Sequence, residues 1–403
     1  MSRFVRTRFV RRSFNTVIVL ALLQIGCLPS TTAGGERLLR NSHHPAYGNI
    51  GYIPPNAALP DDGEIVIGSP MYGGSCDSCD TCEPSCGVCY EDPCCCSAGG
   101  RCGPRWVLYG DHLYLQVTGA DVAHAQQQNG LGGAGTVPFG DISTTEMEFN
   151  SGFRVGGMIA CGPCSGIATS FTHYESDAFT SLDAPVIAGG GGAVGSLVHH
   201  PGAALTASVG PVDATYAIDF QLADLMYRGL WRCGPRYEIN YLVGAQYGHL
   251  DQDFMQSGIF GGGLGGDVDT TTTIDFDGGG LKAGIDAERQ LGRGFSIYGR
   301  LTAAVMSGRF SNRYSMYNVT TDALLAQSNW KDDRVVSQVE YELGLSLSSM
   351  NERWRATAGY MFSHWGNVVT TPEFIDAVQA DNYVDVGDTL SFDGFVSRVE
   401  YRW

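Results

Sequence analysis

The sequence predicts an all-β fold, a transmembrane antiparallel β-barrel of about ten strands. Apolar and polar residues alternate with period two from residue 105 to the C-terminus, and the connections between these segments alternate between short and long. After residue 34 the sequence has no apolar run of about 18 residues, the length that a membrane-spanning helix needs. A chain that spans a membrane without helices must close its strands into a barrel, because only helices and barrels satisfy every backbone polar group in lipid.

Residues 1–34 resemble an export signal. An arginine-rich start precedes a short apolar run, Val17 to Leu28, and Thr31-Thr32-Ala33 ends in a small residue suited to cleavage. Arg11-Arg12 also resembles a twin-arginine signal, but an ordinary basic region is favoured because barrels cross the inner membrane unfolded. The net charge of −17 argues against a nucleic-acid partner.

Residues 35–104 are rich in Pro, Gly, Ser and Cys, and they predict an extended periplasmic tail before the barrel of residues 105–403. Four of its cysteines are spaced like a bacterial ferredoxin motif, but Gly87 stands where that motif has proline. Export into an oxidising space favours disulfides over a metal or an iron–sulfur cluster, and a crosslink to neighbouring copies or to the cell wall is a further hypothesis. The disulfide candidates are Cys76, Cys79, Cys82, Cys86, Cys89, Cys94, Cys95, Cys96, Cys102, Cys161, Cys164 and Cys233.

The motif Cys161-Gly162-Pro163-Cys164 matches the thioredoxin active site. That chemistry needs the first cysteine at a helix N-terminus, where the helix dipole lowers its pKa. Residues 165–175 instead have the pattern of a strand, so the motif predicts a turn between two strands. Whether a disulfide between Cys161 and Cys164 closes this turn stays open.

The alternation defines ten strands joined by short turns and long polar loops. The strands are 105–117, 151–161, 166–176, 214–227, 236–250, 273–289, 294–308, 334–348, 353–364 and 390–403. The short turns, predicted to be periplasmic, are 162–165, 228–235, 290–293 and 349–352, and the long outer loops are 118–150, 177–213, 251–272, 309–333 and 365–389. The parity of apolar residues changes at Gly278-Gly279-Gly280, which predicts a β-bulge there.

Strand parity assigns a polar inner face and an apolar outer face. The charged residues expected to line the lumen are Asp219, Glu238, Asp286, Glu288, Arg300, Glu340, Glu342, Arg355, Arg398, Glu400 and Arg402. The aromatic girdle expected at the lipid interfaces is Trp106, Tyr237, Tyr247, Tyr341, Trp354, Tyr360, Tyr401 and Trp403. The final strand ends in the aromatic Trp403, a feature that the barrel-assembly machinery recognises.

Several segments together resemble a known family. They are Gly110 to Leu115, Thr172 to Ser176, Tyr241 to Phe254, Ile274 to Gly280, Trp330 to Arg334 and Thr370 to Trp403. They resemble the Legionella-type major outer-membrane protein family of pore-forming barrels, especially its planctomycete members. The resemblance covers about residues 105–403 and not the cysteine-rich tail, whose role it leaves open. It implies an outer-membrane pore, and it supplies no catalytic residues.

We therefore expect an outer-membrane pore for passive diffusion of small hydrophilic solutes or ions, without a cofactor and not an enzyme. Two alternatives remain open. A ten-stranded barrel is narrow, so ion pairs can fill it and leave a structural barrel anchored or crosslinked through its tail. Alternatively, His249, Asp251, His364 and Asp332-Asp333 could form a surface-protease site at the outer rim, although Lys331 to Arg334 more simply form salt bridges. The expected partners are lipid, the assembly machinery and other copies of the chain.

Overall fold

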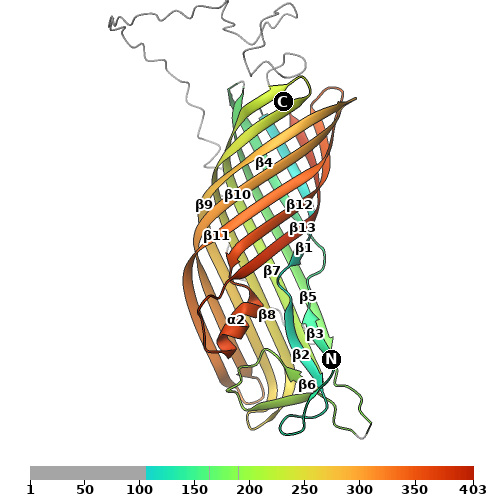
Figure 1. Cartoon of the computed structure of the whole chain (residues 1–403), viewed down its shortest axis with the longest axis vertical. Helices are drawn as coiled ribbons and strands as arrows, with labels where there is room; N and C mark the ends of the chain where they lie inside the picture. Colours follow the sequence, from blue (N-terminus) through green and yellow to red (C-terminus); the bar gives the residue numbers. More distant parts are fainter. Residues whose placement is uncertain (1–105, 163, 189) are drawn as a thin grey trace, which may run out of the picture. The chain divides into compact units, whose positions relative to one another are not determined.

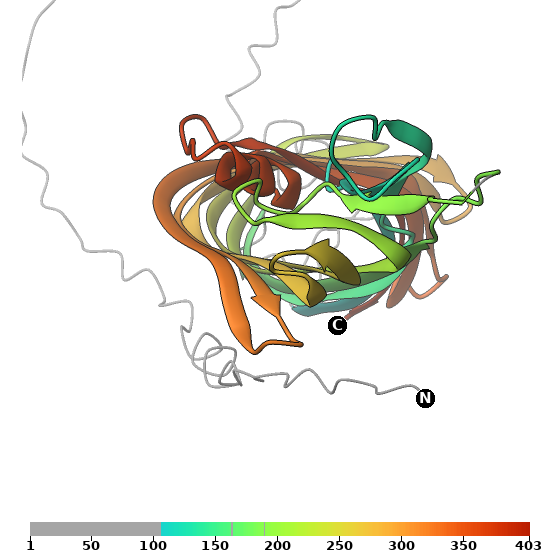
Figure 2. The ribbon, with the colours of Figure 1, turned by 90° about the horizontal axis from the view of Figure 1, so that it is seen from below.

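The computed structural model describes residues 106–162, 164–188 and 190–403. This part of the chain forms one antiparallel sheet in which ten strands close into a ring, as predicted (Figures 1 and 2). Around the ring the order is β7-β5-β4-β1-β13-β12-β11-β10-β9-β8, and β7 pairs with β8 to close it. The ring strands are β1 (Trp106–Thr118), β4 (Asn150–Gly162), β5 (Ser165–Leu182), β7 (Leu205–Gly234), β8 (Tyr237–Gly262), β9 (Gly266–Gly292), β10 (Phe295–Asn318), β11 (Ala323–Ser348), β12 (Trp354–Val368) and β13 (Asp388–Arg402).

The stagger of the strands sets the width of the barrel. Cross-strand pairs followed from Asp111 through β13, β12, β11 and β10 reach Gln290 on β9. Followed the other way, through β4, β5, β7 and β8, they reach Gly278 on the same strand, so the stagger is 290 − 278 = 12 residues. Eight strands enclose an interior just wide enough for side chains to fill, so a ring of ten strands is somewhat wider than that.

The two ends of the barrel differ. At the end that we call the turn end, the strands are joined by short turns, at residues 163–164, 235–236, 293–294 and 349–353. The predicted turn over 228–235 is too long, because β7 continues to Gly234. At the opposite end, the loop end, two predicted loops are wrong: residues 251–272 and 309–333 are mostly strand, because β8 and β9 meet at 263–265 and β10 and β11 at 319–322.

At the loop end, the wall of the barrel extends on one side of the ring only, along strands β7 to β11. Strands β7 to β11 have 24 to 30 residues, whereas β12, β13, β1 and β4 have 13 to 15. In Figure 1 the long strands therefore extend far below the short ones. The other three loops fold against this extension as β2 (Val122–Gln128), β3 (Pro138–Thr145), β6 (Ala193–Ser196) and the helix α2 (Thr371–Gln379). No helix among the described residues is long and apolar enough to cross a membrane.

The long strands reverse their sidedness part of the way along. On β8, Tyr241 and Val243 point outward in the turn-end half, whereas Leu250 and Phe254 point inward in the loop-end half. Odd-numbered residues of β8 point outward along the whole strand, so its register does not change. What changes is the apolar face: near the turns the apolar side chains point outward, and near the loops they point inward into a core. The bulge predicted at 278–280 on β9 is therefore wrong, and the pairing with β8 and β10 passes through these glycines without a register shift.

Candidate functional site

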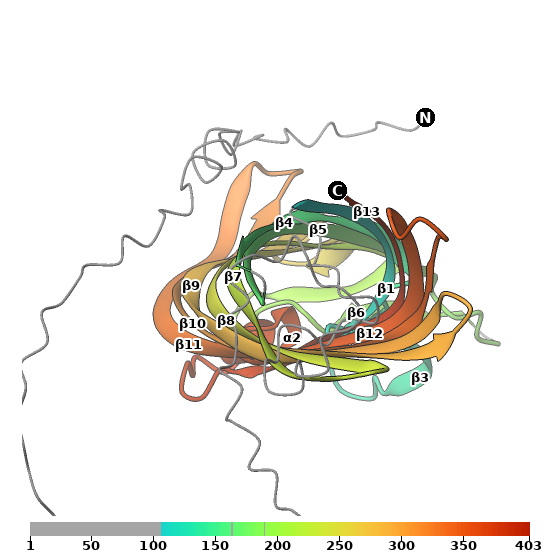
Figure 3. The ribbon, with the colours of Figure 1, turned by 90° about the horizontal axis from the view of Figure 1, so that it is seen from above.

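The turn-end half of the lumen contains a charge-lined cavity. Its volume is about 1170 Å³, and residues of the short turns, such as Pro235 and Gly294, form its mouth. Figure 3 looks into the barrel from this end. The lining residues come from every strand of the ring, because the inward positions near the turns are polar on most of them.

The inner end of the cavity is crossed by ion pairs between opposite walls. Arg154 of β4 places Nη2 3.0 Å from Oε1 of Glu340, and Nη1 3.5 Å from Oε2 of Glu342, both on β11. Arg398 of β13 binds Asp111 of β1 through two hydrogen bonds of 2.7 Å. All five side chains are buried, so the layer is a network of two arginines and three carboxylates held away from water.

Further ion pairs line the cavity wall. Lys282 Nζ lies 3.0 Å from Asp224 Oδ2, and Arg228 holds Asp286 by two hydrogen bonds of 2.9 and 3.0 Å. Among the predicted lumen cations, Arg355 Nη2 lies 2.9 Å from Glu288 Oε2.

Arg300 is one exception in this wall. It lines the cavity between Asp286 of β9 and Glu342 of β11, yet its guanidinium makes no hydrogen bond or ion pair with any described residue. Arg236 and Arg293, which also line the cavity, form no ion pair with a described residue either, so these three arginines are the cavity cations without a direct carboxylate contact.

Two glycines, Gly344 and Gly359, leave room for the side chain of Tyr298 in this network. A Cβ on Gly344 of β11 or Gly359 of β12 would approach the Tyr298 side chain to 2.8 or 2.7 Å. The Tyr298 ring thus lies over both glycines, and its hydroxyl donates to Glu342 Oε1 at 2.7 Å. The Glu342 carboxylate of β11 is therefore held both by Arg154 of β4 and by Tyr298 of β10.

Beyond the ion pairs, aromatic side chains close the lumen. Phe220 of β7 and Phe392 of β13 stand four strands apart in the ring, but their ring centroids lie 4.6 Å apart. Tyr174 and Trp365 pack against this pair, and the Tyr174 hydroxyl donates to the Leu115 carbonyl at 2.8 Å. All four rings are at most 2% exposed, so these side chains pack tightly against one another and their neighbours at this level of the lumen.

The helix α2 completes the closure at the loop end. Phe374, Ile375 and Val378 of α2 are buried against the core inside the strand extension, and Figure 2 shows the helix and β6 at this mouth. Gln252 of β8 anchors the start of the helix: its Oε1 accepts from Thr371 N and Oγ1 at 3.2 and 3.3 Å, and its Nε2 donates to Val369 O at 2.8 Å.

Two histidines are buried in this loop-end cap. Burial lowers the pKa of His124, on β2, and of His199, in the segment after β6, to about 4 in each case. The Nε2 atom of each ring has no hydrogen-bond partner among the described residues. Both imidazoles are therefore neutral near pH 7, and the cap holds groups that acid would charge.

The structure places most of the predicted lumen residues on the inner face. Those that line the cavity are Glu238, Asp286, Glu288, Arg300, Glu340, Arg355, Arg398, Glu400 and Arg402. Glu342 faces inward as well, in the ion-pair layer. The assignment of Asp219 is wrong: its neighbours Ile218 and Phe220 point into the core and Asp219 points outward, because this part of β7 lies beyond the reversal of sidedness.

In the turn-end half of the lumen, the inward charges that sequence reasoning missed include Asp111, Arg154, Asp224, Arg228 and Lys282. Parity carried a signal for most of them. Arg154 lies between Phe153 and Val155, and Lys282 between Leu281 and Ala283, all four of which face outward. Asp111 lies between Gly110 and His112, where parity of apolar residues gives no such signal.

The predicted girdle residues all point outward, but they occupy several depths. Trp106 stacks on Trp403 with ring centroids 6.4 Å apart, and Trp354 packs on Tyr401 at 4.7 Å, all at the turn end together with Tyr237. Tyr341 and Tyr360 lie near the middle of the apolar band, and Tyr247 at its loop-end edge.

The cysteine predictions are largely outside the described residues. This holds for Cys76, Cys79, Cys82, Cys86, Cys89, Cys94, Cys95, Cys96 and Cys102, as it does for the predicted signal and tail. Cys161 lies one residue before the end of β4, and Cys164 and Cys233 line the mouth of the cavity. The pairing of these cysteines stays a prediction.

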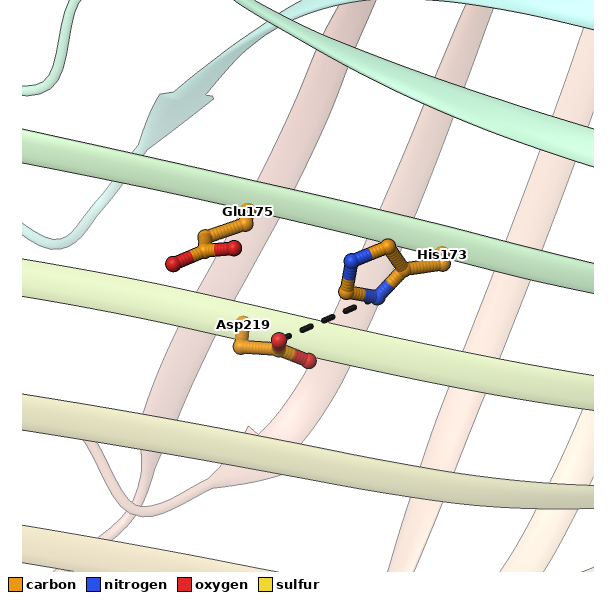
Figure 4. Close-up of side chains that lie close together, drawn as sticks. All are labelled: His173, Glu175 and Asp219. Atoms are coloured by element: carbon orange, nitrogen blue, oxygen red, sulfur yellow. Dashed lines mark ion pairs between the residues drawn. The ribbon is translucent and has the colours of Figure 1, made fainter. Parts of the chain in front are cut away.

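A group that could hold a metal ion lies outside the lumen (Figure 4). His173 and Glu175 of β5 and Asp219 of β7 point outward, and their candidate ligand atoms all lie within 4.8 Å of one another. Within this group, an ion pair of 3.8 Å joins His173 Nδ1 and Asp219 Oδ2. This group and the outward Asp251 and Asp275 follow one another across neighbouring strands, so they mark the loop-end edge of the apolar band.

The residues considered for a protease site do not converge. His249 points outward between Asp251 and Asp277, at 3.0 Å from each. His364 also points outward and meets Ser391, whereas Asp332 points inward on β11 and pairs with Arg334. Asp333 binds the exposed Arg309. These groups lie on different faces of different strands and cannot act on one bound water.

One comparison with known proteins, the match to a family model, identifies an outer-membrane protein family. The family model described as the Legionella pneumophila major outer membrane protein precursor matches residues 102–402. No curated protein matches the chain. Among solved structures, the outer membrane protease OmpT from Escherichia coli shows 10% identity and a TM-score of 0.42, over 74% of this chain and 96% of its own. A Pseudomonas aeruginosa FadL homologue shows 9% identity and a TM-score of 0.27, over 74% of this chain and 90% of its own. Acinetobacter baumannii CarO shows 10% identity and a TM-score of 0.22, over 70% of this chain and 97% of its own.

Proposed function

The chain belongs to the family of the Legionella pneumophila major outer membrane protein, and from this premise we propose that it is a pore for small hydrophilic solutes or ions, closed in the state described here. It is an outer-membrane β-barrel. In such barrels the short turns face the periplasm and the long connections face the exterior. The charged cavity would therefore open to the periplasm, and the aromatic layer with its α2 cap would close the outer mouth.

The observation that carries this proposal is the charge-lined cavity at the membrane level. Its lining combines ion pairs with arginines that have no direct carboxylate contact among the described residues, Arg300 among them, around about 1170 Å³ of space that opens at the turn end. A barrel with a purely structural role is most stable when its lumen is filled, because a cavity costs stability. A solute path would use this cavity and the arginines that line it.

The alternative, a non-conducting structural barrel, is favoured by a different observation. Phe220, Phe392, Tyr174 and Trp365 meet across the whole lumen and are almost fully buried. Conduction therefore requires this layer to move, and a barrel whose aromatic layer never moves would only strengthen the envelope.

Single-channel recording in planar bilayers separates the two functions. A pore should give discrete conductance steps, and the double variant Phe220→Ala/Phe392→Ala should raise the open fraction because it removes the rings that meet in the lumen. Phe153→Ala, on the outer face of β4, is the matched control and should behave as the wild-type protein does. A silent wild-type protein and a silent double variant, both folded, would establish the structural barrel instead.

We also propose that the barrel has no protease activity. The support is the separation of His249, His364 and Asp332 on opposite faces of the wall. Cleavage of a casein or peptide library by the purified protein, abolished by Asp332→Asn, would contradict this.

A further inference from the structure

The outer wall carries a row of carboxylates at the loop-end edge of the apolar band. Glu175 of β5 is paired in register with Asp219 of β7. Asp219 is in turn opposite Asp251 of β8, which is opposite Asp275 of β9. All four side chains point outward, and like charges directly opposite each other destabilise a sheet. The sheet therefore gains stability when a positive charge lies along this row.

Lysine and arginine do not supply that charge at the β5 end of the row. The strands β5 and β8 contain neither residue, and in β7 and β9 both occur only in the turn-end half. Further along the row, His249 lies 3.0 Å from Asp251. Among the described residues, neither Glu175 nor Asp219 forms an ion pair with a lysine or an arginine, and the ring beside them is that of His173.

His173 adds a nitrogen ligand to these two carboxylates. It stands two residues from Glu175 on β5, so both side chains share the outer face, and Asp219 approaches from the neighbouring strand. Figure 4 shows the imidazole and the two carboxylate groups turned toward one another, and their candidate ligand atoms all lie within 4.8 Å of one another. The imidazole packs edge-on against Phe153 of β4, with ring centroids 5.5 Å apart, which holds it in this place.

The Nδ1 atom of His173 lacks a partner in this arrangement. It is shielded from water and forms no hydrogen bond with any described residue. Asp219 Oδ2 lies 3.8 Å away, which is too far for a hydrogen bond. In a tetrahedral zinc site, ligand atoms about 2.0–2.2 Å from the metal are about 3.3–3.6 Å apart, so this pair is already close to that separation. A metal ion between the two atoms would give the shielded nitrogen the partner whose absence costs free energy.

We propose that His173, Glu175 and Asp219 bind a divalent metal ion of the zinc type on the outer wall of the barrel. An imidazole with two carboxylates suits Zn²⁺, whereas Mg²⁺ and Ca²⁺ prefer sites made of oxygen atoms alone. Three protein ligands leave a fourth position for water, and the exposed side chain of Glu175 leaves the site open to ions from the medium. The ion would join β5 to β7 and offset the charges that face each other there. The inference goes beyond the proposed function, because a pore needs no metal.

The test measures zinc binding to the full-length chain in detergent, after a chelator has removed bound metal and has itself been removed. Free thiols are alkylated beforehand, so that cysteines do not bind the added ion. Calorimetric titration with zinc chloride should show one ion per wild-type chain that Asp219→Asn loses or binds roughly a hundredfold more weakly. Asp213→Asn is the matched control, because it makes the same charge change on the outer face of β7, six residues away, and it should bind zinc as the wild-type protein does.

His173→Gln tests the nitrogen ligand and should lose the same ion, while an excess of magnesium chloride should leave zinc bound to the wild-type protein. Heat-dependent gel mobility reports whether each variant has closed its barrel, and only folded variants are compared. Undiminished binding in Asp219→Asn or His173→Gln overturns the proposal. An equal loss in Asp213→Asn, or displacement of zinc by magnesium, also overturns it, because either would indicate a general attraction of cations to the acidic wall. None of these results depends on whether the barrel conducts.

Discussion

Arg154 of β4 reaches across the lumen to Glu340 of β11, four strands away in the ring, with Nη2 3.0 Å from Oε1. The same guanidinium also meets Glu342 and Asp111, at 3.5 and 3.8 Å. One buried cation therefore compensates three carboxylates from two opposite walls. Removing it would leave those carboxylates buried and under-compensated, which is far more costly than losing an exposed pair.

Arg154→Met should therefore destabilise the barrel by about 3–5 kcal/mol. The measurement is the free energy of unfolding in detergent or lipid, from urea titration followed by tryptophan fluorescence. Arg309→Met is the control, because Arg309 and Asp333 form an exposed pair on the outer face and its loss should cost about 1 kcal/mol or less. Equal losses for the two variants would show that the lumen network carries no special stability.

Arg300 gives a second prediction, which rests on the pore function. Arg300→Glu replaces a positive charge of the cavity wall with a negative one, so the permeability ratio of chloride to potassium should fall severalfold. The reversal potential in asymmetric potassium chloride, recorded on the Phe220→Ala/Phe392→Ala background, measures this ratio. Lys331→Glu changes the charge equally but points outward, and it should leave the reversal potential unchanged.

The buried histidines predict an acid-sensitive cap. The pKa of His124 and His199 is about 4 in the folded protein and near 6.5 in an exposed imidazole, so the unfolded cap binds more protons between these values. The stability of the cap is complete above pH 6.5 and is lost as the pH falls toward 4. Proteolysis of the loop-end segments should accelerate over that range.

A double variant provides the control for the pH effect. His124→Phe/His199→Phe has no imidazole to charge, so its proteolysis rate at the loop end should change much less between pH 7 and pH 4. If the wild-type protein and this variant respond identically to pH, the two histidines do not govern the cap.

The sequence predicted the ten strands well near the turns and poorly near the loops. Alternation such as that of Tyr241 and Val243 against Asn240 and Leu242 locates a strand whichever side faces lipid, and this is why the ring was found. Beyond the apolar band, Asp251 of the same strand points outward and Leu250 points inward. Acidic residues at outward positions make this part of the sequence resemble a polar loop. The reversal explains the missed hairpins, the false bulge at 278–280 and the wrong side of Asp219.

The lumen itself could be predicted only in part. Parity indicates that Glu340 and Arg398 face inward, but it cannot tell which strands stand opposite each other, because that depends on the stagger of twelve residues. The Arg154–Glu340 contact and the meeting of Phe220 with Phe392 both depend on that stagger. The sequence pattern of a single strand therefore could not predict which side chains meet across the lumen and close it.

The anchor of α2 gives the last prediction. Gln252 is fully buried on β8, and its amide satisfies Thr371 N, the Thr371 and Tyr216 hydroxyls and the Val369 carbonyl. Gln252→Leu keeps the volume but leaves these groups without partners, at a cost of about 1–3 kcal/mol. Amide hydrogen exchange of residues 371–379 should accelerate by roughly tenfold to a hundredfold while β1 and β13 keep their protection. Gln221→Leu, which points outward on β7, should change neither. Unchanged exchange in α2 would mean that its apolar contacts with the core, through Phe374 and Ile375, hold the helix without this anchor.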